Sequence, residues 1–377
     1  MPDLNDVDVR PDPTKIDTIS PSALNRLLGC PRRLAYSRDG KTSSWQRPTT
    51  RTALGTAAHR LTESVERAKK TPPAKDMSAW LRASWDDLVA AQVHALSAAW
   101  PDRDVPPPRS WPGYATTKVR LIRGLERRIA THTGPAPDPH GSPGTGTGGQ
   151  PPLPWVERRL EDAGSQLFGT PDRVEDIQGT LRVVDLKSGV HQGEINETQK
   201  RQLLIYAWLV NQTLNRLPDV LVVVDVAGRE KVLAVDATEV DRVVTGAATA
   251  VHEFNAAVSG GARLQSHPAP ELCRWCEFRI VCGDYWAARE DQWPSHRDIA
   301  GSVVSVTQTH VEVKPFSGED THRLVMTGAE IPVVGEILVA VDLESAGYAT
   351  SRMKWNSRLR VQPAEPVPTG SAAPSAT

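Results

Sequence analysis

The sequence predicts an α/β fold followed by a small all-β unit near the C-terminal end of its 377 residues. Between residues 156 and 258, short runs of β-branched residues alternate with longer amphipathic stretches, which is typical of a mixed sheet flanked by helices. Residues 302–362 contain only short alternating runs separated by turns, which favours strands alone. Charged residues make up 24% of the chain, so a packed core is expected and global disorder is not.

The N-terminal third is predicted to be mainly helical. Residues 1–18 are polar and rich in proline, so we expect a flexible arm. Ser20 and Pro21 then suit the N-cap and the first position of a helix that runs to Cys30. Helical periodicity returns in three further stretches: one that begins near Leu54, one at 77–100 and one at 114–132.

The central part of the chain is predicted to supply the sheet. A proline- and glycine-rich break at 134–154 precedes it, and we interpret this break as a surface insertion within one domain of residues 19–297. Strands are then expected at 156–160, 166–174, 181–186, 221–226 and 231–235, and helices at 197–215 and 238–258.

The C-terminal unit is expected to span residues 298–362 and to contain roughly five short strands. An OB-like barrel, which would bind single-stranded nucleic acid or a partner protein, is one arrangement of such strands. Residues 363–377 are predicted to be a disordered tail. No apolar run approaches the roughly 18 residues of a membrane helix, and the N-terminus lacks the pattern of a secretion signal. We therefore expect a cytoplasmic protein with no membrane partner.

Two acidic residues and one lysine have the spacing of a hydrolytic metal site. Asp185 and Lys187 lie two apart in a predicted strand, so their side chains point to the same face. Asp172 lies in the preceding predicted strand. Two carboxylates can hold Mg²⁺ or Mn²⁺, which acidifies a bound water, and a neighbouring lysine can orient that water. A D-x-K tripeptide by itself is also common on solvated surfaces, so the interpretation depends on further motifs.

Four motifs together resemble those of the RecB-family PD-(D/E)XK nucleases. Gly169-Thr170-Pro171-Asp172 and the following V-V-D-L-K-S-G at 183–189 are similar to the two central motifs of that family. Upstream, the stretch Gly55 to His59 resembles its G-x-x-x-H helix, and downstream, Gln202 to Tyr206 resembles its Q-x-x-x-Y helix. All four occur in the order that the family shows.

The resemblance implies a restriction-endonuclease-like core, with a mixed sheet flanked by helices, and a role for each motif residue. His59, Asp172 and Asp185 would bind Mg²⁺ or Mn²⁺, and Lys187 would assist the attacking water. Gln202 and Tyr206, four apart on one helix face, would contact and position DNA. Glu157 stands where the family often carries a strand glutamate, and a structural role for it is equally compatible with the sequence.

The four cysteines are arranged as three plus one. Cys273, Cys276 and Cys282 form C-x2-C-x5-C, and Cys30 lies far upstream, which suggests a metal centre rather than disulfides in a cytosolic protein. The arrangement resembles the branch of the family that includes AddB-type repair nucleases and CRISPR adaptation nucleases. That resemblance implies a 4Fe–4S cluster held by the four thiolates as a structural staple. A structural zinc site uses the same thiolates and stays open as the alternative.

Three aromatic residues accompany the cysteines. Trp275, Tyr285 and Trp286 could stack on single-stranded bases, but covering an apolar centre is the more common role of such residues, and we favour it. Basic residues outnumber acidic ones between residues 26 and 70, which suits either a phosphate backbone or a solvated helix surface.

The functional prediction is a metal-dependent DNA nuclease. The resemblance implies an exonuclease that prefers single-stranded DNA or ends and acts in repair, recombination or antiphage defence, with a helicase or a defence-complex protein as a partner. A non-catalytic DNA-binding subunit of such a complex is the alternative, and the motifs also allow an RNA-directed nuclease.

Overall fold

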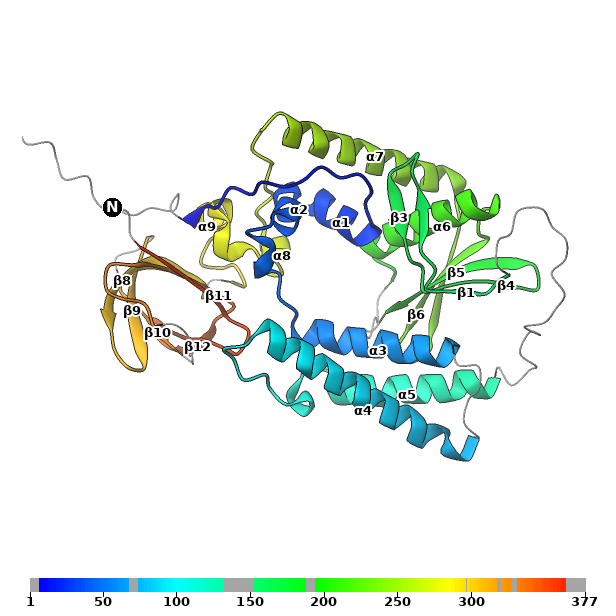
Figure 1. The fold of residues 1–377 in the computed structure, drawn as a ribbon, viewed down its shortest axis with the longest axis horizontal. Helices are drawn as coiled ribbons and strands as arrows, with labels where there is room; N and C mark the ends of the chain where they lie inside the picture. The colour runs from blue at the N-terminus through cyan, green and yellow to red at the C-terminus, as the bar shows by residue number, and fades with distance from the viewer. Residues whose placement is uncertain are drawn as a thin grey trace, which may run out of the picture.

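The computed structural model describes residues 7–67, 74–131, 152–187, 194–295, 297–316, 320–326 and 331–363, and Figure 1 shows their arrangement. Most of the predicted insertion at 134–154 and nearly all of the predicted tail at 363–377 lie outside these residues. A mixed sheet with its covering helices forms one end of the molecule, and the all-β unit forms the other. The α/β fold with a C-terminal all-β unit is confirmed.

The central sheet has the strand order β1-β4-β5-β6-β7. These strands are β1 (Trp155–Val156), β4 (Arg173–Ile177), β5 (Thr180–Lys187), β6 (Val220–Asp225) and β7 (Glu230–Ala234). β5 and β6 are parallel and the other neighbouring pairs are antiparallel, so the sheet is mixed. Helix α6 (Glu197–Leu214) makes the crossover that a parallel pair requires.

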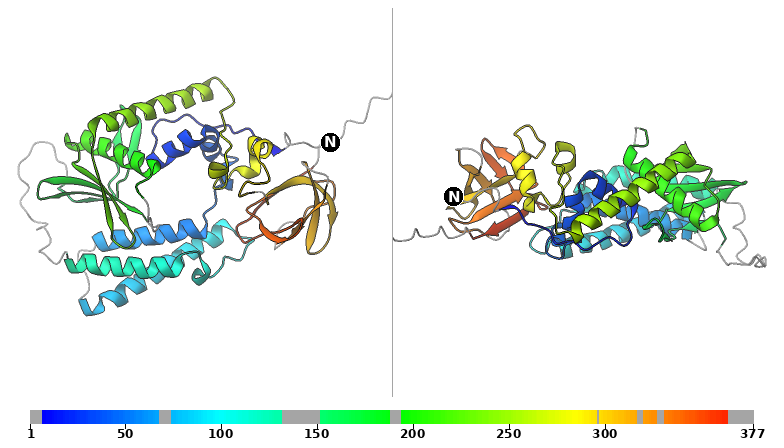
Figure 2. Two further views of the ribbon diagram at one scale, coloured as in Figure 1. Left: turned by 180° about the vertical axis from the view of Figure 1, so that it is seen from behind. Right: turned by 90° about the horizontal axis from the view of Figure 1, so that it is seen from above.

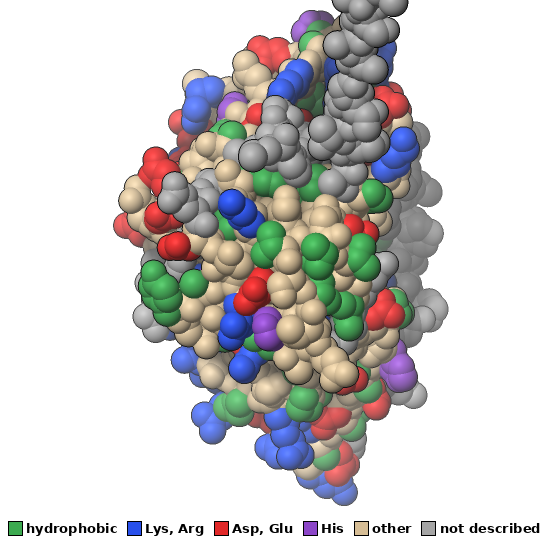
Figure 3. Space-filling model, turned by 90° about the vertical axis from the view of Figure 1, so that its left-hand side faces the viewer, with side chains coloured by type: hydrophobic (Ala, Val, Ile, Leu, Met, Phe, Trp, Pro, Cys, Tyr) green, Lys and Arg blue, Asp and Glu red, His purple; other side chains and the backbone are tan. Residues whose placement is uncertain are grey.

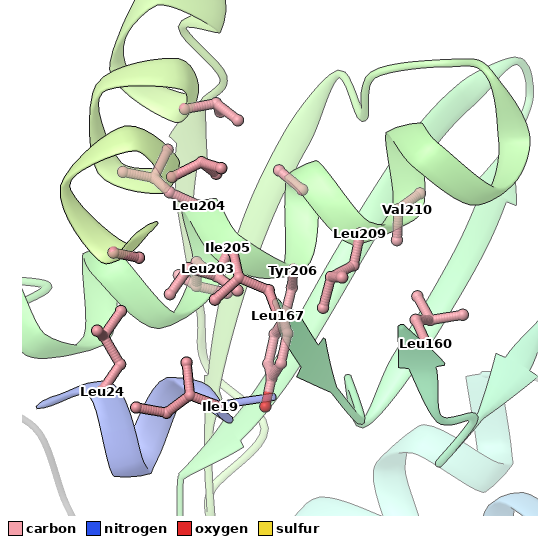
Figure 4. Close-up of a cluster of buried hydrophobic side chains, with 14 of the residues drawn as sticks. Ile19, Leu24, Leu160, Leu167, Leu203, Leu204, Ile205, Tyr206, Leu209 and Val210 are labelled. Atoms are coloured by element: carbon pink, nitrogen blue, oxygen red, sulfur yellow. The ribbon is translucent and has the colours of Figure 1, made fainter. Parts of the chain in front are cut away.

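Helices α6 and α7 (Ala237–Ser259) cover one face of this sheet, as Figure 2 shows from behind. The apolar side chains of α6 form the largest core of the protein. Figure 4 shows Leu203 and Leu209 of this helix close to Leu167 and to Ile19, which precedes the first helix. Burial of these side chains fixes the rotation of α6 on the sheet, and therefore decides which of its residues reach the edge where β5 ends.

The two strands predicted at 156–160 and 166–174 are each divided in the structure. The first gives β1 and β2 (Leu160–Asp162), and the second gives β3 (Leu167–Gly169) and β4. β2 and β3 pair with each other and pack on α6 instead of joining the central sheet. Asp172 consequently lies immediately before β4 rather than within a strand, contrary to the prediction.

A helical layer lies on the other side of the sheet. It consists of α3 (Thr50–Arg67), α4 (Ala74–Ala99) and α5 (Tyr114–Thr131), close to the helical stretches that the sequence predicts. Their apolar faces form a second core around Leu61 and Trp85. Gly124 of α5 approaches the sheet so closely that a Cβ atom there would lie 3.1 Å from the carbonyl oxygen of Val226.

The N-terminal segment is packed along its described length. Residues 7–18 were expected to form a flexible arm, but Val7 and Ile16 are buried and the amide of Val9 donates to the carbonyl of Val281 at 3.0 Å. Helix α1 (Pro21–Gly29) then begins as predicted, since the Ser20 hydroxyl accepts a hydrogen bond from the amide of Ala23. Helix α2 (Pro31–Arg38) follows directly, so Cys30 lies at the junction of the two helices.

The all-β unit is a seven-stranded sheet rather than the roughly five strands predicted. Its strands are β8 (Ile299–Val306), β9 (His310–Pro315), β10 (His322–Val325), β11 (Ile337–Val341), β12 (Glu344–Gly347), β13 (Thr350–Arg352) and β14 (Arg358–Gln362), in the order β12-β13-β10-β9-β8-β11-β14. The outer face seen in Figure 3 carries acidic, basic and apolar side chains side by side. That mixture does not favour nucleic-acid binding by this face.

The cysteine segment, residues 270–288, joins the two ends of the molecule. It contains α8 (Pro270–Cys273), the 3-10 turn η4 (Arg279–Val281) and α9 (Gly283–Ala288). Alternate residues of β11 pack against it, with Val339 in contact with the cluster around Phe278 and Tyr285, while Leu338 faces the core of the β unit. In the part of the chain that the structure describes, no helix is long and apolar enough to span a membrane.

Candidate active site

Three ligand-type side chains from separate elements meet at the edge of the central sheet. The Nε2 atom of His59 on α3 lies 2.6 Å from Oδ1 of Asp172 and 3.2 Å from Oε1 of Glu157. One ligand atom of each residue lies within 4.8 Å of the others. The pairing of β1 with β4 produces this meeting, because the amide of Glu157 donates to the carbonyl of Asp172 at 3.1 Å. Histidine and carboxylate ligands together suit a divalent cation.

Glu157 is the residue of this group that sequence reasoning left undecided. It directly follows β1 and has a φ of 50°, in the left-handed region that residues with a side chain rarely adopt. Such a conformation costs about 1 kcal/mol or more and is usually retained at functional positions. The left-handed turn brings its carboxylate to His59. The sequence signal for it was its position where the resembled family often carries a strand glutamate.

A second group of side chains surrounds Asp185 at the end of β5. The ammonium group of Lys187 lies 2.7 Å from Oδ2 of Asp185 and donates to Oε1 of Gln202 at 3.1 Å. The amide nitrogen of Gln202 is 3.1 Å from Oδ1 of Asp185 and 2.9 Å from the hydroxyl of Tyr206. The predicted spacing therefore holds. Asp185 and Lys187 are two residues apart on the strand, Gln202 and Tyr206 are four apart on α6, and these spacings bring all four side chains together.

The carboxylate of Asp185 is buried, and its Oδ2 lies 2.7 Å from the ammonium group of Lys187. A buried carboxylate beside the other acids of the site can also serve as a ligand of a divalent cation. The two groups are joined through Asp172, because its Oδ2 accepts a hydrogen bond from the amide of Leu186, next to Asp185.

The pKa values of the site residues are shifted because several acidic side chains lie close together and are partly buried. The hydrogen bond that the His59 ring donates to Asp172, together with the charge of that carboxylate, raises the pKa of His59 to about 9. Burial raises the pKa of Glu157 to about 7 and that of Asp185 to about 6, although Lys187 acts in the opposite direction on Asp185. The carboxylates resist sharing the site as anions, and a divalent cation would relieve this repulsion.

Tyr206 is buried and contacts the site through Gln202. Its ring is only 6% exposed, and its hydroxyl meets the amide of Gln202. The ring also explains the glycine of the G-T-P-D motif, because a Cβ atom on Gly169 would lie 2.7 Å from Cε1 of Tyr206. The contact of Tyr206 with DNA that the resemblance implied stays a prediction, and in this structure its hydroxyl contacts Gln202.

The family comparison agrees with this geometry. The family model for the PD-(D/E)XK nuclease superfamily matches residues 18–283, which include every residue of both groups. The chain belongs to the PD-(D/E)XK nuclease superfamily. Members of this superfamily are typically metal-dependent nucleases that act on DNA, and the group of His59, Glu157 and Asp172 fits a divalent metal.

Other comparisons add little to the superfamily assignment. A search of the curated proteins gives no match. Among solved structures, one titled "Crystal structure of SSO0001" matches over 62% of this chain and 96% of that chain, with 17% identity and a TM-score of 0.24. A likeness at that TM-score supports no conclusion about the activity of this PD-(D/E)XK protein.

The four cysteines lie outside this candidate site and line one pocket between α1, α2 and the cysteine segment. All four are free thiols, and within the described chain no three of their sulfur atoms lie within 4.8 Å of one another. Burial raises the pKa of Cys276 and of Cys282 to about 12. Buried thiols of this kind stay protonated unless a cation binds them.

The aromatic residues beside the cysteines differ in exposure. Tyr285 and Trp286 are 1% and 6% exposed and belong to the core that the cysteines contact, as the interpretation of them as an apolar cover requires. Trp275 is 59% exposed, so that interpretation is wrong for it.

Proposed function

We propose that this protein is a deoxyribonuclease that hydrolyses phosphodiester bonds with Mg²⁺ or Mn²⁺. The observation that carries the proposal is the meeting of His59, Glu157 and Asp172 beside the buried carboxylate of Asp185. These four residues would hold the metal, which adds Glu157 to the three ligands that the sequence suggests. Oxygen-rich ligand sets of this kind suit Mg²⁺ and Mn²⁺.

The residues around the ligands have separate tasks in this proposal. When bound, the metal supplies charge neutralisation and a more acidic water. Lys187 donates hydrogen bonds to the attacking water and the phosphate oxygens, because its ammonium group is held between Asp185 and Gln202. Gln202 keeps both partners in place, and Tyr206 in turn fixes the amide of Gln202.

The substrate preference is proposed from the order of the four motifs. The RecB-like order supports an exonuclease that acts on single-stranded DNA or ends, in repair, recombination or antiphage defence. A covalently closed single-stranded circle should therefore resist cleavage, whereas a linear strand of the same sequence should be degraded. Equal cleavage of the two would show an endonuclease.

The cysteine pocket is proposed to hold a 4Fe–4S cluster through Cys30, Cys273, Cys276 and Cys282. Structural zinc would use the same four thiolates and is the alternative that metal analysis distinguishes from the cluster. Arg33 and Arg279 line the same pocket and would offset the charge of four thiolates. Anaerobic purification should yield a protein with iron and sulfide, and stoichiometric zinc in their place would overturn the cluster.

The activity test compares Asp185→Asn with a matched control, Asp176→Asn. Asp176 lies on the same sheet but pairs with Arg216 at 2.9 Å, away from the ligand group. Wild type and Asp176→Asn should degrade linear single-stranded DNA when Mg²⁺ or Mn²⁺ is added, and Asp185→Asn should be slower by more than about 100-fold. Equal cleavage by all three would overturn the site, and DNA binding without cleavage by wild type would favour a non-catalytic binding subunit.

A further inference from the structure

Trp275 is exposed in a protein whose other tryptophans are buried or half-buried. Among the eleven tryptophans, all of them in described parts of the chain, it is the one with an exposed side chain, at 59%. It lies in the C-x2-C turn between Cys273 and Cys276, and it is not part of the core around Tyr285 and Trp286. A large aromatic ring held at the surface is a common contact for another molecule.

Two arginines lie over this ring. The guanidinium carbon of Arg274 is 4.5 Å from the ring centroid, and that of Arg51 is 5.4 Å from it. Both arginines are exposed, and within the described residues neither side chain forms an ion pair with an acid. Positive charge without an acidic partner beside an open aromatic ring is complementary to a base and its adjoining phosphates.

Hydrogen bonds hold the backbone of the turn that carries Trp275. The carbonyl of Trp275 accepts a hydrogen bond from Arg33 at 2.9 Å, and Arg33 is in turn paired with Glu277 at 2.6 Å. The carbonyl of Arg274 accepts from the buried Arg279, also at 2.9 Å. A ligand that stacks on the ring therefore pays little entropy to order the turn.

We propose that Trp275, Arg51 and Arg274 form a stacking platform for one base of single-stranded DNA, separate from the metal site. The proposal rests on the proposed function, because it names a binding site for the same substrate. The platform favours a single strand over a duplex because a paired base is stacked within the helix and cannot lie on the ring. Stacking on an aromatic face also needs no particular base, so the site is tolerant of sequence.

Helix α3 sets the separation between the platform and the metal ligands. Arg51 and His59 are eight residues apart on this helix, which runs from the side of the cysteine segment to the sheet in Figure 1. Eight residues correspond to about 12 Å along the axis. At about 3.4 Å per stacked nucleotide, a strand would extend three to four nucleotides from the metal before reaching the ring. The platform should therefore act only on strands longer than about four nucleotides.

The test measures binding without cleavage. Full-length protein carrying Asp185→Asn is titrated with fluorescent oligo-dT of 2 to 12 nucleotides, and affinity is read from anisotropy. Adding Trp275→Ala should weaken binding of the 12-mer by about 5- to 100-fold, and Trp275→Phe should restore most of the loss. The dinucleotide should bind equally to both proteins.

Two further variants separate the platform from a folding effect. Tyr348→Ala removes an aromatic ring that is 94% exposed on the β unit and should leave affinity unchanged. Arg51→Gln lies on α3, outside the cysteine turn, and should lower the slope of affinity against salt by about one charge. Iron content and melting temperature identify any variant in which the cysteine turn itself has failed.

Several outcomes would overturn the platform. Wild-type affinity of Trp275→Ala for every length, together with an unchanged salt slope of Arg51→Gln, would do so directly. A Trp275-dependent affinity confined to oligo-U would replace DNA with RNA. Because binding is read without catalysis, a protein that binds through Trp275 but never cuts leaves the platform standing and removes the nuclease proposal alone.

Discussion

The candidate active site at the sheet and the cysteine segment achieve their geometry in opposite ways. At the sheet, functional side chains project from regular elements, with Asp185 and Lys187 two apart on β5 and Gln202 and Tyr206 four apart on α6. Regular periods convert spacing in the sequence into proximity in space. The cysteines instead lie at turns and helix junctions, where spacing fixes no direction.

A buried arginine supplies the geometry that the cysteine segment lacks on its own. The guanidinium of Arg279, 3% exposed, donates to the carbonyls of Cys273, Arg274 and Cys276 at 2.8, 2.9 and 3.0 Å. It also pairs with Asp298 at 2.9 Å and with Asp342 at 2.7 Å, both from the β unit. The turn that holds two of the cysteines is therefore shaped by residues that follow it in the chain.

The cysteine segment consequently depends on the β unit for its conformation. Removing residues after 298 would take away Asp342 and would expose Phe278, which packs beside Val339 and Val341. A truncation of this kind tests folding of the cysteine segment before it tests DNA binding. Point substitutions are the better way to compare the two regions.

The largest expected effect is that of Arg279→Met. The substitution leaves Asp298 buried without its counter-charge and frees three carbonyls of the cysteine turn, which should cost about 3–5 kcal/mol of unfolding free energy. Arg323→Met, which removes an exposed pair with Glu312, should cost about 1 kcal/mol or less. Denaturant unfolding measures both, and equal stability of the two variants would show that the β unit does not support the cysteine turn.

A matched pair of glycines gives the next effect. A Cβ atom on Gly301 would lie 2.2 Å from the backbone oxygen of Lys314, whereas one on Gly169 would meet side-chain atoms alone, the ring of Tyr206 at 2.7 Å being the nearest. Gly301→Ala should therefore cost about 1–3 kcal/mol or more, and Gly169→Ala less. Only Gly169→Ala should slow DNA cleavage, because it displaces the side chain that holds Gln202. Thermal melts and cleavage rates measured on both variants check this division, which reversed results would contradict.

Metal binding should depend on pH through the histidine at the sheet. With a pKa of about 9 in the metal-free protein, His59 must lose a proton before it binds a cation. The affinity for Mn²⁺ should fall about tenfold as the pH is lowered from 8 to 7, and more steeply below the pKa of about 7 for Glu157. Calorimetry in two buffers measures the released protons, and His59→Gln should remove most of the dependence between pH 7 and 8. An affinity independent of pH would contradict this role.

The stability of the metal-free fold should depend on pH in the opposite sense to the metal affinity. The pKa of His59 is raised from 6.5, so its ion pair with Asp172 stabilises the fold fully below pH 6.5. This contribution is lost as the pH rises toward 9. Added metal should therefore stabilise the protein most at the alkaline end of this range.

The smallest expected effect is a gain in stability rather than a loss. Gly246 lies within α7, and a Cβ atom there would meet nothing within 4 Å. Gly246→Ala should stabilise the protein by about 0.5–1 kcal/mol, because alanine loses less backbone entropy in a helix. Gly124→Ala in α5 lacks this space and should give no such gain. Melting temperatures distinguish the two, and a destabilised Gly246→Ala would show that α7 meets a surface outside the described residues.

Local rules determined much of this protein from the sequence alone. The N-cap at Ser20, the helix that carries His59, and the side-by-side placement of Asp185 and Lys187 follow from capping and from the periods of helix and strand. The order of the motifs also identified the superfamily, since it does not depend on how distant segments pack.

Only the tertiary structure decided the remaining features. Glu157 reaches His59 because β1 pairs with β4, and the strand predicted at 166–174 is divided because β2 and β3 pack on α6. Tyr285 and Trp275 are similar residues near the same cysteines, yet the β unit covers the first and leaves the second exposed. Each of these outcomes depends on contacts between segments far apart in the chain, for which local periodicity carries no information.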